Sequence, residues 1–144
     1  MSVATLAVRP PPRGLHAGAA VLLLAALAAA LALQAGVAPL RVATLLLIAP
    51  LAEEAVLRAG LHDALLRRAL APALANLACA LLFGLAHALL RGQAAGLAVA
   101  LPALAIGAVY GRARSLPDAV LLHAAFNAVW LAAAASDLLP RFLR

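Results

Sequence analysis

The sequence contains few charges, few aromatic residues, a single cysteine and no lysine. Charged residues make up 11% of the 144 positions, whereas soluble domains carry about 25%, so the composition excludes an ordinary soluble globule. The net charge of +6 comes from arginines that lie singly or in pairs between apolar runs. Nucleic acid is therefore excluded as a partner, because there is no basic face with aromatic residues to stack on bases. The lone Cys79 excludes a disulfide framework and a CxxC metal site.

Apolar residues, mainly alanine, leucine and valine, fill the chain instead. They account for 67% of it, and the mean hydropathy is +1.09. A membrane-spanning helix needs about 20 mostly apolar residues, so the chain has room for about five. We therefore predict an all-α integral membrane helical bundle with spans at 17–35, 40–58, 72–90, 93–111 and 117–138. The spans form a single domain at 17–138, between tails at 1–16 and 139–144.

Prolines indicate both helix starts and irregular positions inside helices. Pro39, Pro72 and Pro117 lie at or near predicted first turns, where the missing N–H costs nothing. Pro50 and Pro102 lie inside apolar runs. There, each proline frees a backbone carbonyl and bends the helix unless a neighbouring group compensates.

The stretch after the second span is amphipathic. In residues 61–70 the leucines gather on one side, away from His62 and Asp63. We predict a separate short interfacial helix over this stretch. His62 and Asp63 are assigned to the membrane interface, where they need no special role.

The distribution of arginines gives a weak prediction of orientation. With the N-terminus inside, seven arginines lie on the cytoplasmic side and four outside, which favours a cytoplasmic N-terminal tail. Arg9 and Arg13 before the apolar run 19–33 also resemble a secretory signal. That run is longer than the usual h-region of about 7–15 residues, so we favour an uncleaved span. The alanine and arginine content suggests a GC-rich source, and we expect a bacterial inner membrane.

Ionisable residues at membrane depth are costly, and they mark candidate functional positions. The only glutamates, Glu53 and Glu54, are adjacent inside the second apolar run. Glu54 and Arg58 are four residues apart and can form an ion pair, while Glu53 is turned about 100° away and left free. A free carboxylate at this depth suits a group that accepts and returns a proton. Alternatively, the two acids cap backbone freed by Pro50 or line a water-filled crevice.

Two further apolar runs each carry a polar position of interest. His87 stands alone near a predicted helix end, where a histidine is more often interfacial than catalytic. His123 and Asn127 are four residues apart and share one helix face. Asn127 falls near mid-span, where its amide needs a partner. The two residues form a patch of two donors, and the alternative for Asn127 is a hydrogen bond to another helix, as expected for Asn76.

Together these residues form three motifs, each on a different predicted span. They are EEAVLR at 53–58, FGLAH at 83–87 and HAAFN at 123–127. The chain resembles the CPBP family of intramembrane proteases, also called the CAAX-processing type II or ABI family, whose motifs EExxxR, FxxxH and HxxxN occur in this order. The stretch from about residue 39 to residue 130 corresponds to the family's core domain. The extra flanking helices of larger members are missing.

The resemblance implies a catalytic site of five residues, which are Glu53, Glu54, His87, His123 and Asn127. Glu53, helped by His87, would activate a water for attack on a peptide carbonyl. His123 and Asn127 would donate hydrogen bonds to the oxyanion that develops. The substrate would be a membrane-anchored protein or peptide cleaved close to or within the bilayer, with a C-terminal sorting or anchor segment as the candidate.

The resemblance also implies supporting residues around an intramembrane polar cavity. Glu54 would position the site and line the cavity with the other catalytic residues, and Arg58, which holds Glu54, and Phe83 would give structural support. No cofactor is expected. Two alternatives stay open. One is a zinc protease with Glu53, His87 and His123 as metal ligands. The other is a non-catalytic immunity or partner-binding protein of the same fold.

The predicted span boundaries leave one geometric conflict. At 1.5 Å per residue, Glu53 lies about 20 Å from the outer face and His87 about 22 Å from the inner one. In a core about 30 Å thick, the two residues are then separated by roughly 12 Å in depth. A second helix that continues through residues 61–69 would move Glu53 toward mid-membrane, and a third helix that tilts would bring His87 back.

Overall fold

Every regular element in the described part of the chain is helical. The structure is a computed structural model that describes residues 13–136, with side chains from residue 18 onward. The helical segments are α1 (Arg13–Gln34), a long helix composed of α2 (Pro39–Ala43), η1 (Thr44–Ile48), α3 (Ala49–Glu54), η2 (Ala55–His62) and α4 (Asp63–Arg67), then α5 (Pro72–Arg91), η3 (Ala94–Val99) joined to α6 (Ala100–Ala113), and α7 (Leu116–Ala135). The predicted tails and the end of the last predicted span lie at least partly outside the described residues.

The long helix runs without interruption from residue 39 to residue 67. The prediction of a separate interfacial helix over 61–70 is therefore wrong. Between Pro50 and residue 67, no proline or turn interrupts the helix, and Gly60 lies within the π-helical segment η2. The helix ends where Ala69 adopts a positive φ of 60°. Because of this extension, Glu53 lies midway along the helix, which removes much of the depth conflict.

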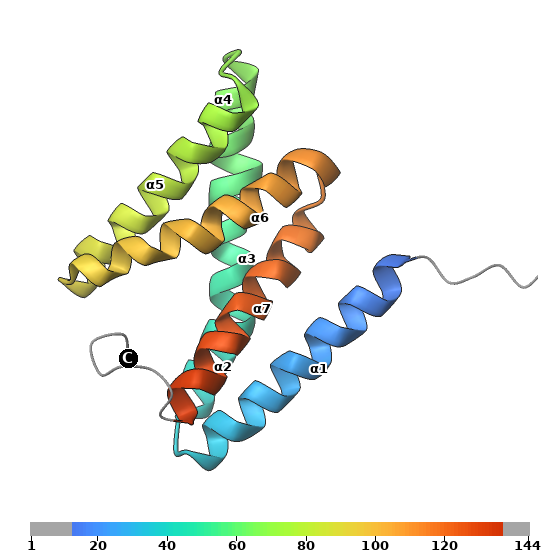
Figure 1. The fold of residues 1–144 in the computed structure, drawn as a ribbon, viewed down its shortest axis with the longest axis vertical. Helices are drawn as coiled ribbons and strands as arrows, with labels where there is room; N and C mark the ends of the chain where they lie inside the picture. Colours follow the sequence, from blue (N-terminus) through green and yellow to red (C-terminus); the bar gives the residue numbers. More distant parts are fainter. Residues whose placement is uncertain (1–12, 137–144) are drawn as a thin grey trace, which may run out of the picture.

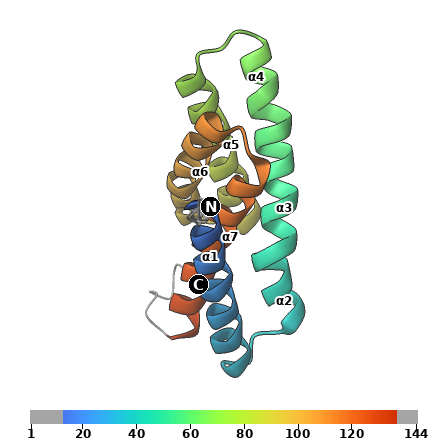
Figure 2. The ribbon, with the colours of Figure 1, turned by 90° about the vertical axis from the view of Figure 1, so that its right-hand side faces the viewer.

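The other helices lie on one side of this long helix (Figures 1 and 2). Helix α1 packs along α7, and α6 packs between α5 and α7. The η1, α3 and η2 segments contact α7, and η2 also contacts α5. Helix α5 is inclined to the long helix in Figure 1. The motif-bearing segments α3, α5 and α7 therefore lie around one region of the bundle.

Small residues occupy the helix contacts and leucines cover the outside. The buried clusters contain Ala28, Ala32 and Ala128 between α1 and α7, and Ala80 with Ala103 between α5 and α6. Outward-facing leucines are broadly exposed, with Leu90 at 86%. This arrangement is typical of membrane bundles, where small residues permit close packing and lipid covers the large side chains.

Three helices in the described region are long and apolar enough to cross a membrane. They are Pro72–Arg91, Ala94–Ala113 and Leu116–Ala135, and a shorter apolar helix covers Gly18–Gln34. A spanning helix needs about 20 such residues. The predicted all-α fold is confirmed, and the chain is an integral membrane protein.

Gly96 marks a close approach of two backbones, between η3 and α5. A Cβ atom added at Gly96 would lie 2.6 Å from the backbone nitrogen of Ala88 and 2.7 Å from the carbonyl carbon of His87. Such a clash cannot be relieved by rotating a side chain, so the two segments would have to separate. At Gly111, by contrast, an added Cβ meets nothing within 4 Å.

We therefore expect Gly96→Ala to destabilise the protein by about 1–3 kcal/mol, the usual cost of overpacking. Gly111→Ala is the matched control and should be neutral or slightly stabilising, because alanine favours helix. Unfolding of the detergent-solubilised proteins, followed by circular dichroism, measures both. Equal stabilities for the two variants would contradict the close contact.

Candidate functional site

Two opposite charges are buried at the centre of the bundle. Arg58 is 0% exposed and Glu54 is 1% exposed. Nε of Arg58 donates to Oε2 of Glu54 over 2.7 Å, which confirms the ion pair predicted from their spacing. Such a pair is tolerated only when its remaining donors and acceptors are also satisfied.

The guanidinium of Arg58 meets this requirement by reaching two other helices. Nη2 donates to the Ala103 carbonyl in α6 over 2.8 Å, and Nη1 lies 3.5 Å from Oδ1 of Asn76 in α5. The amide of Asn76 in turn donates to the Leu104 carbonyl over 3.0 Å. Both carbonyls point along α6 toward Gly107, where an added Cβ would clash with Asn76 and Arg58. The missing side chain at Gly107 therefore leaves room for these contacts.

The second oxygen of Glu54 holds His123 of α7. Oε1 of Glu54 lies 2.7 Å from Nδ1 of His123. Because a carboxylate only accepts, Nδ1 carries the proton of this bond. The other ring nitrogen, Nε2, lies 3.5 Å from Oε2 of Glu53. A chain of polar contacts therefore runs from Arg58 through Glu54 and His123 to Glu53, and only Glu53 is substantially exposed, at 33%.

His87 of α5 is oriented by its own helix. Its Nδ1 lies 3.1 Å from the Phe83 carbonyl, one turn earlier. A carbonyl only accepts, so Nδ1 donates, and Nε2 of a neutral ring is left as a proton acceptor. The Phe83 ring lies 4.3 Å from the His87 ring and 5.9 Å from the His123 ring, between centroids. Phe83 therefore packs against both imidazoles.

Asn127 of α7 is anchored to an irregularity in the long helix. Its Nδ2 donates to the Leu45 carbonyl over 2.8 Å. In the π-helical register of η1, the N–H of Ala49 bonds to the Thr44 carbonyl. The next donor in this register would belong to residue 50, and Pro50 has none. Asn127 thus supplies the compensation expected for Pro50, and its second amide hydrogen is not used by this bond.

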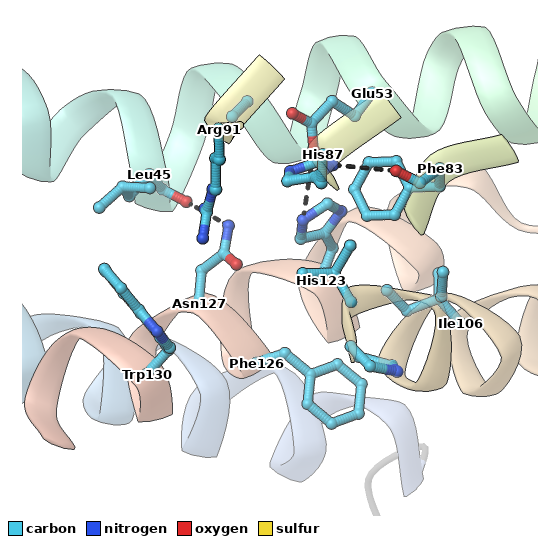
Figure 3. Close-up of a pocket in the computed structure, with 14 residues that line it drawn as sticks. Leu45, Glu53, Phe83, His87, Arg91, Ile106, His123, Phe126, Asn127 and Trp130 are labelled. Carbon is cyan, nitrogen blue, oxygen red and sulfur yellow. Dashed lines mark hydrogen bonds and ion pairs between the residues drawn. The ribbon is translucent and has the colours of Figure 1, made fainter. Parts of the chain in front are cut away.

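Four of the predicted site residues line one pocket of about 210 Å³. Figure 3 shows Glu53, His87, His123 and Asn127 converging on it from three helices. Glu54 does not line it, but lies behind His123. The pocket lining, including residues that the sequence did not single out, consists of Leu45, Ala49, Glu53, Phe83, His87, Arg91, Val99, Pro102, Ala103, Ile106, His123, Phe126, Asn127 and Trp130.

A second, mostly apolar groove is also lined by two of these residues, Glu53 and His87. It is lined by Glu53 and His87 together with Ala52, Val56, Leu57, Phe83, Ala86 and Leu90. The groove lies between the long helix and α5. Glu53 and His87 therefore line both the pocket within the bundle and this apolar groove.

The assignment of His62 and Asp63 to the interface is wrong for His62. His62 is 1% exposed, with its ring 5.7 Å from that of Tyr110. Asp63 accepts from the Tyr110 hydroxyl over 3.1 Å and pairs with Arg114 over 2.9 Å. These contacts join the end of the long helix to the end of α6. Sequence spacing could not reveal them, because they join residues 47 or more positions apart.

The arrangement of zinc ligands considered above is not found. Among the described histidine, cysteine, aspartate and glutamate side chains, no group of three is placed to hold a metal ion. Each nitrogen of His123 faces a carboxylate oxygen. A catalytic zinc would need three protein ligands directed at one point.

Fold and site together define a helical membrane protein with a carboxylate and two imidazoles beside a pocket. A family model described as "Type II CAAX prenyl endopeptidase Rce1-like" matches residues 17–129. The chain belongs to this Rce1-like family, which is a family of intramembrane peptidases. No curated protein and no solved structure matches the chain.

The paired charges give a first prediction for the site. Arg58→Met leaves Glu54 buried without its cation and should destabilise the protein by about 3–5 kcal/mol. The control is Arg114→Met, which breaks an ion pair whose arginine side chain is 48% exposed and should cost about 0–1 kcal/mol. Unfolding in detergent measures both variants. A loss in Arg58→Met no larger than in the control would contradict the role given to the buried pair.

The link between Pro50 and Asn127 gives a second prediction. Asn127→Ala leaves the Leu45 carbonyl unsatisfied and should cost about 1–3 kcal/mol. In a Pro50→Ala background, a backbone N–H can take over this carbonyl, so the same change should cost less. A double-mutant cycle of unfolding free energies measures the difference. Strictly additive costs would show that the proline and the asparagine are not coupled.

Proposed function

We propose that this protein hydrolyses a peptide bond of a membrane-anchored protein or peptide, with Glu53 and His87 activating the attacking water. The observation that carries the proposal is the convergence of Glu53 and His87 with a histidine and an asparagine on one pocket. Family membership supports the same chemistry, because the family model is that of an endopeptidase.

In the proposed reaction, a water lies between Glu53 and His87. Glu53 takes one proton, and Nε2 of His87 accepts a hydrogen bond from the other and orients the water. The water oxygen bonds to the carbonyl carbon, and the carbonyl oxygen becomes an oxyanion. Glu53 then returns its proton to the amine as the C–N bond breaks. The products are a carboxylic acid and an amine, so no redox partner is needed.

His123 and Asn127 stabilise the oxyanion. The second amide hydrogen of Asn127 is a donor whose position is fixed by the bond to Leu45. His123 contributes Nε2–H in its doubly protonated form, in which Nδ1 bonds to Glu54. Donors held in place before the reaction stabilise the developing charge without reorganisation. Glu54 and Arg58 serve as positioning residues.

The substrate and setting are part of the proposal. The protein processes a C-terminal sorting or anchor segment in a bacterial inner membrane, with its N-terminal tail in the cytoplasm. The arginine distribution supports this orientation. The apolar groove beside Glu53 and His87 suits an apolar chain that arrives from the membrane. The polar pocket would then be the intramembrane cavity in which the bond is cleaved.

Glu53→Gln should abolish peptidase activity of the purified protein in detergent while the fold is kept, because only the proton acceptor is removed. His87→Gln should do the same. Asn127→Ala and His123→Ala should each lower the rate by roughly 100- to 1000-fold, the usual cost of one oxyanion donor. The matched control is Asp118→Asn, the same change from acid to amide at an exposed position in the first turn of α7.

Internally quenched apolar peptides report activity, and mass spectrometry of membrane-protein termini with and without the gene reports natural cleavage. Chelators should have no effect. Activity lost on chelation and restored by zinc would favour the zinc alternative. A cellular phenotype that survives Glu53→Gln would favour a non-catalytic binding protein.

A further inference from the structure

Arg91 is a pocket residue that the proposed reaction does not use. It is the last residue of α5, one helical turn after His87, and it lines the same pocket. In Figure 3 its side chain extends beside Asn127 and Leu45, away from Glu53. The pocket therefore has a carboxylate and two imidazoles in one region and a guanidinium in another.

No carboxylate in the described part of the chain pairs with Arg91. The ion pairs there join Arg58 to Glu54, Arg114 to Asp63, and His123 to the two glutamates. Glu53, the one acid that lines the pocket, faces His123. A guanidinium presents up to five donors in a planar fork that matches a carboxylate. An open guanidinium in a pocket is thus suited to an incoming anion.

The distance along α5 limits where this anion lies on a substrate. One helical turn rises about 5.4 Å, and an extended peptide advances about 3.3 Å per residue. A group held by Arg91 therefore belongs to a residue within about two or three positions of the bond placed at His87. Trp130 and Phe126 line the same pocket and can pack against the intervening residues.

We infer that Arg91 forms a subsite that binds a carboxylate of the substrate close to the cleaved bond. The inference rests on the proposed function for the position of that bond. The carboxylate comes from the C-terminus of the substrate or from an acidic side chain near it. Arg91 extends away from Glu53, so it is a substrate-binding residue and not a catalytic one.

Binding to the inactive Glu53→Gln protein tests the subsite without requiring cleavage. The probes are fluorescent apolar peptides in dodecyl maltoside, identical except for a free acid or an amide at the C-terminus. A third probe ends in an amide and carries one glutamate near that end. The acid-ended peptide should bind roughly 10- to 100-fold more tightly than the amide-ended one, as for a hydrogen-bonded charge pair.

In the Arg91→Gln protein this ratio should fall to about 1, and Arg91→Lys should restore part of it. The matched control is Arg67→Gln, the same loss of charge at an exposed arginine outside the pocket. Tight binding of the third probe would identify an acidic side chain as the source of the carboxylate, and weak binding would identify the C-terminus. In active protein, Arg91→Gln should raise KM for the acid-ended peptide much more than KM for the amide-ended peptide.

An acid-to-amide ratio that is the same with and without Arg91 would overturn the inference. A second result would also overturn it: the Arg91→Gln protein binds phosphatidylglycerol more weakly while the peptide ratio stays the same. Arg91 would then be a lipid contact. If the ratio depends on Arg91 but the unmutated protein cleaves no peptide, the subsite stands and the proposed function fails. If the unmutated protein cleaves the acid-ended and the amide-ended peptide with equal KM, the proposed function stands and the subsite fails.

Discussion

The buried charge of Arg58 is the constraint on which much of the bundle depends. A guanidinium at 0% exposure needs partners for its donors, and these come from the long helix, α5 and α6. The same requirement fixes Glu54, whose second oxygen then fixes His123. One charge that cannot face lipid therefore connects four helices and orients an imidazole of the candidate site.

Close packing and backbone irregularity allow these contacts to form. The missing side chain at Gly107 leaves room for Arg58 and Asn76 against α6. Pro50 removes a donor from the long helix, and Asn127 satisfies the Leu45 carbonyl instead. In the bilayer core, no water is present to form a hydrogen bond with an unsatisfied backbone group. A defect in one helix thus determines the orientation of a side chain on another.

The two adjacent glutamates show how local geometry separates two uses of one residue type. Glu54 is 1% exposed and has a partner for each oxygen, whereas the side chain of Glu53 is 33% exposed. The angle of about 100° between neighbouring helix positions separates their surroundings. The enclosed carboxylate suits a structural role, and the open one suits proton transfer.

The sequence by itself determined the all-helical membrane fold, the Glu54–Arg58 pair and the motif residues, because hydropathy and a spacing of four residues are local properties. It did not reveal that the long helix continues to residue 67, since amphipathic spacing also fits a separate interfacial helix. Only the tertiary structure decided that Glu54 bonds to His123, that Asn127 satisfies Leu45 and that Arg91 lines the pocket. The first two contacts join residues 69 and 82 positions apart. Such contacts depend on how helices cross, which periodicity within one helix does not specify.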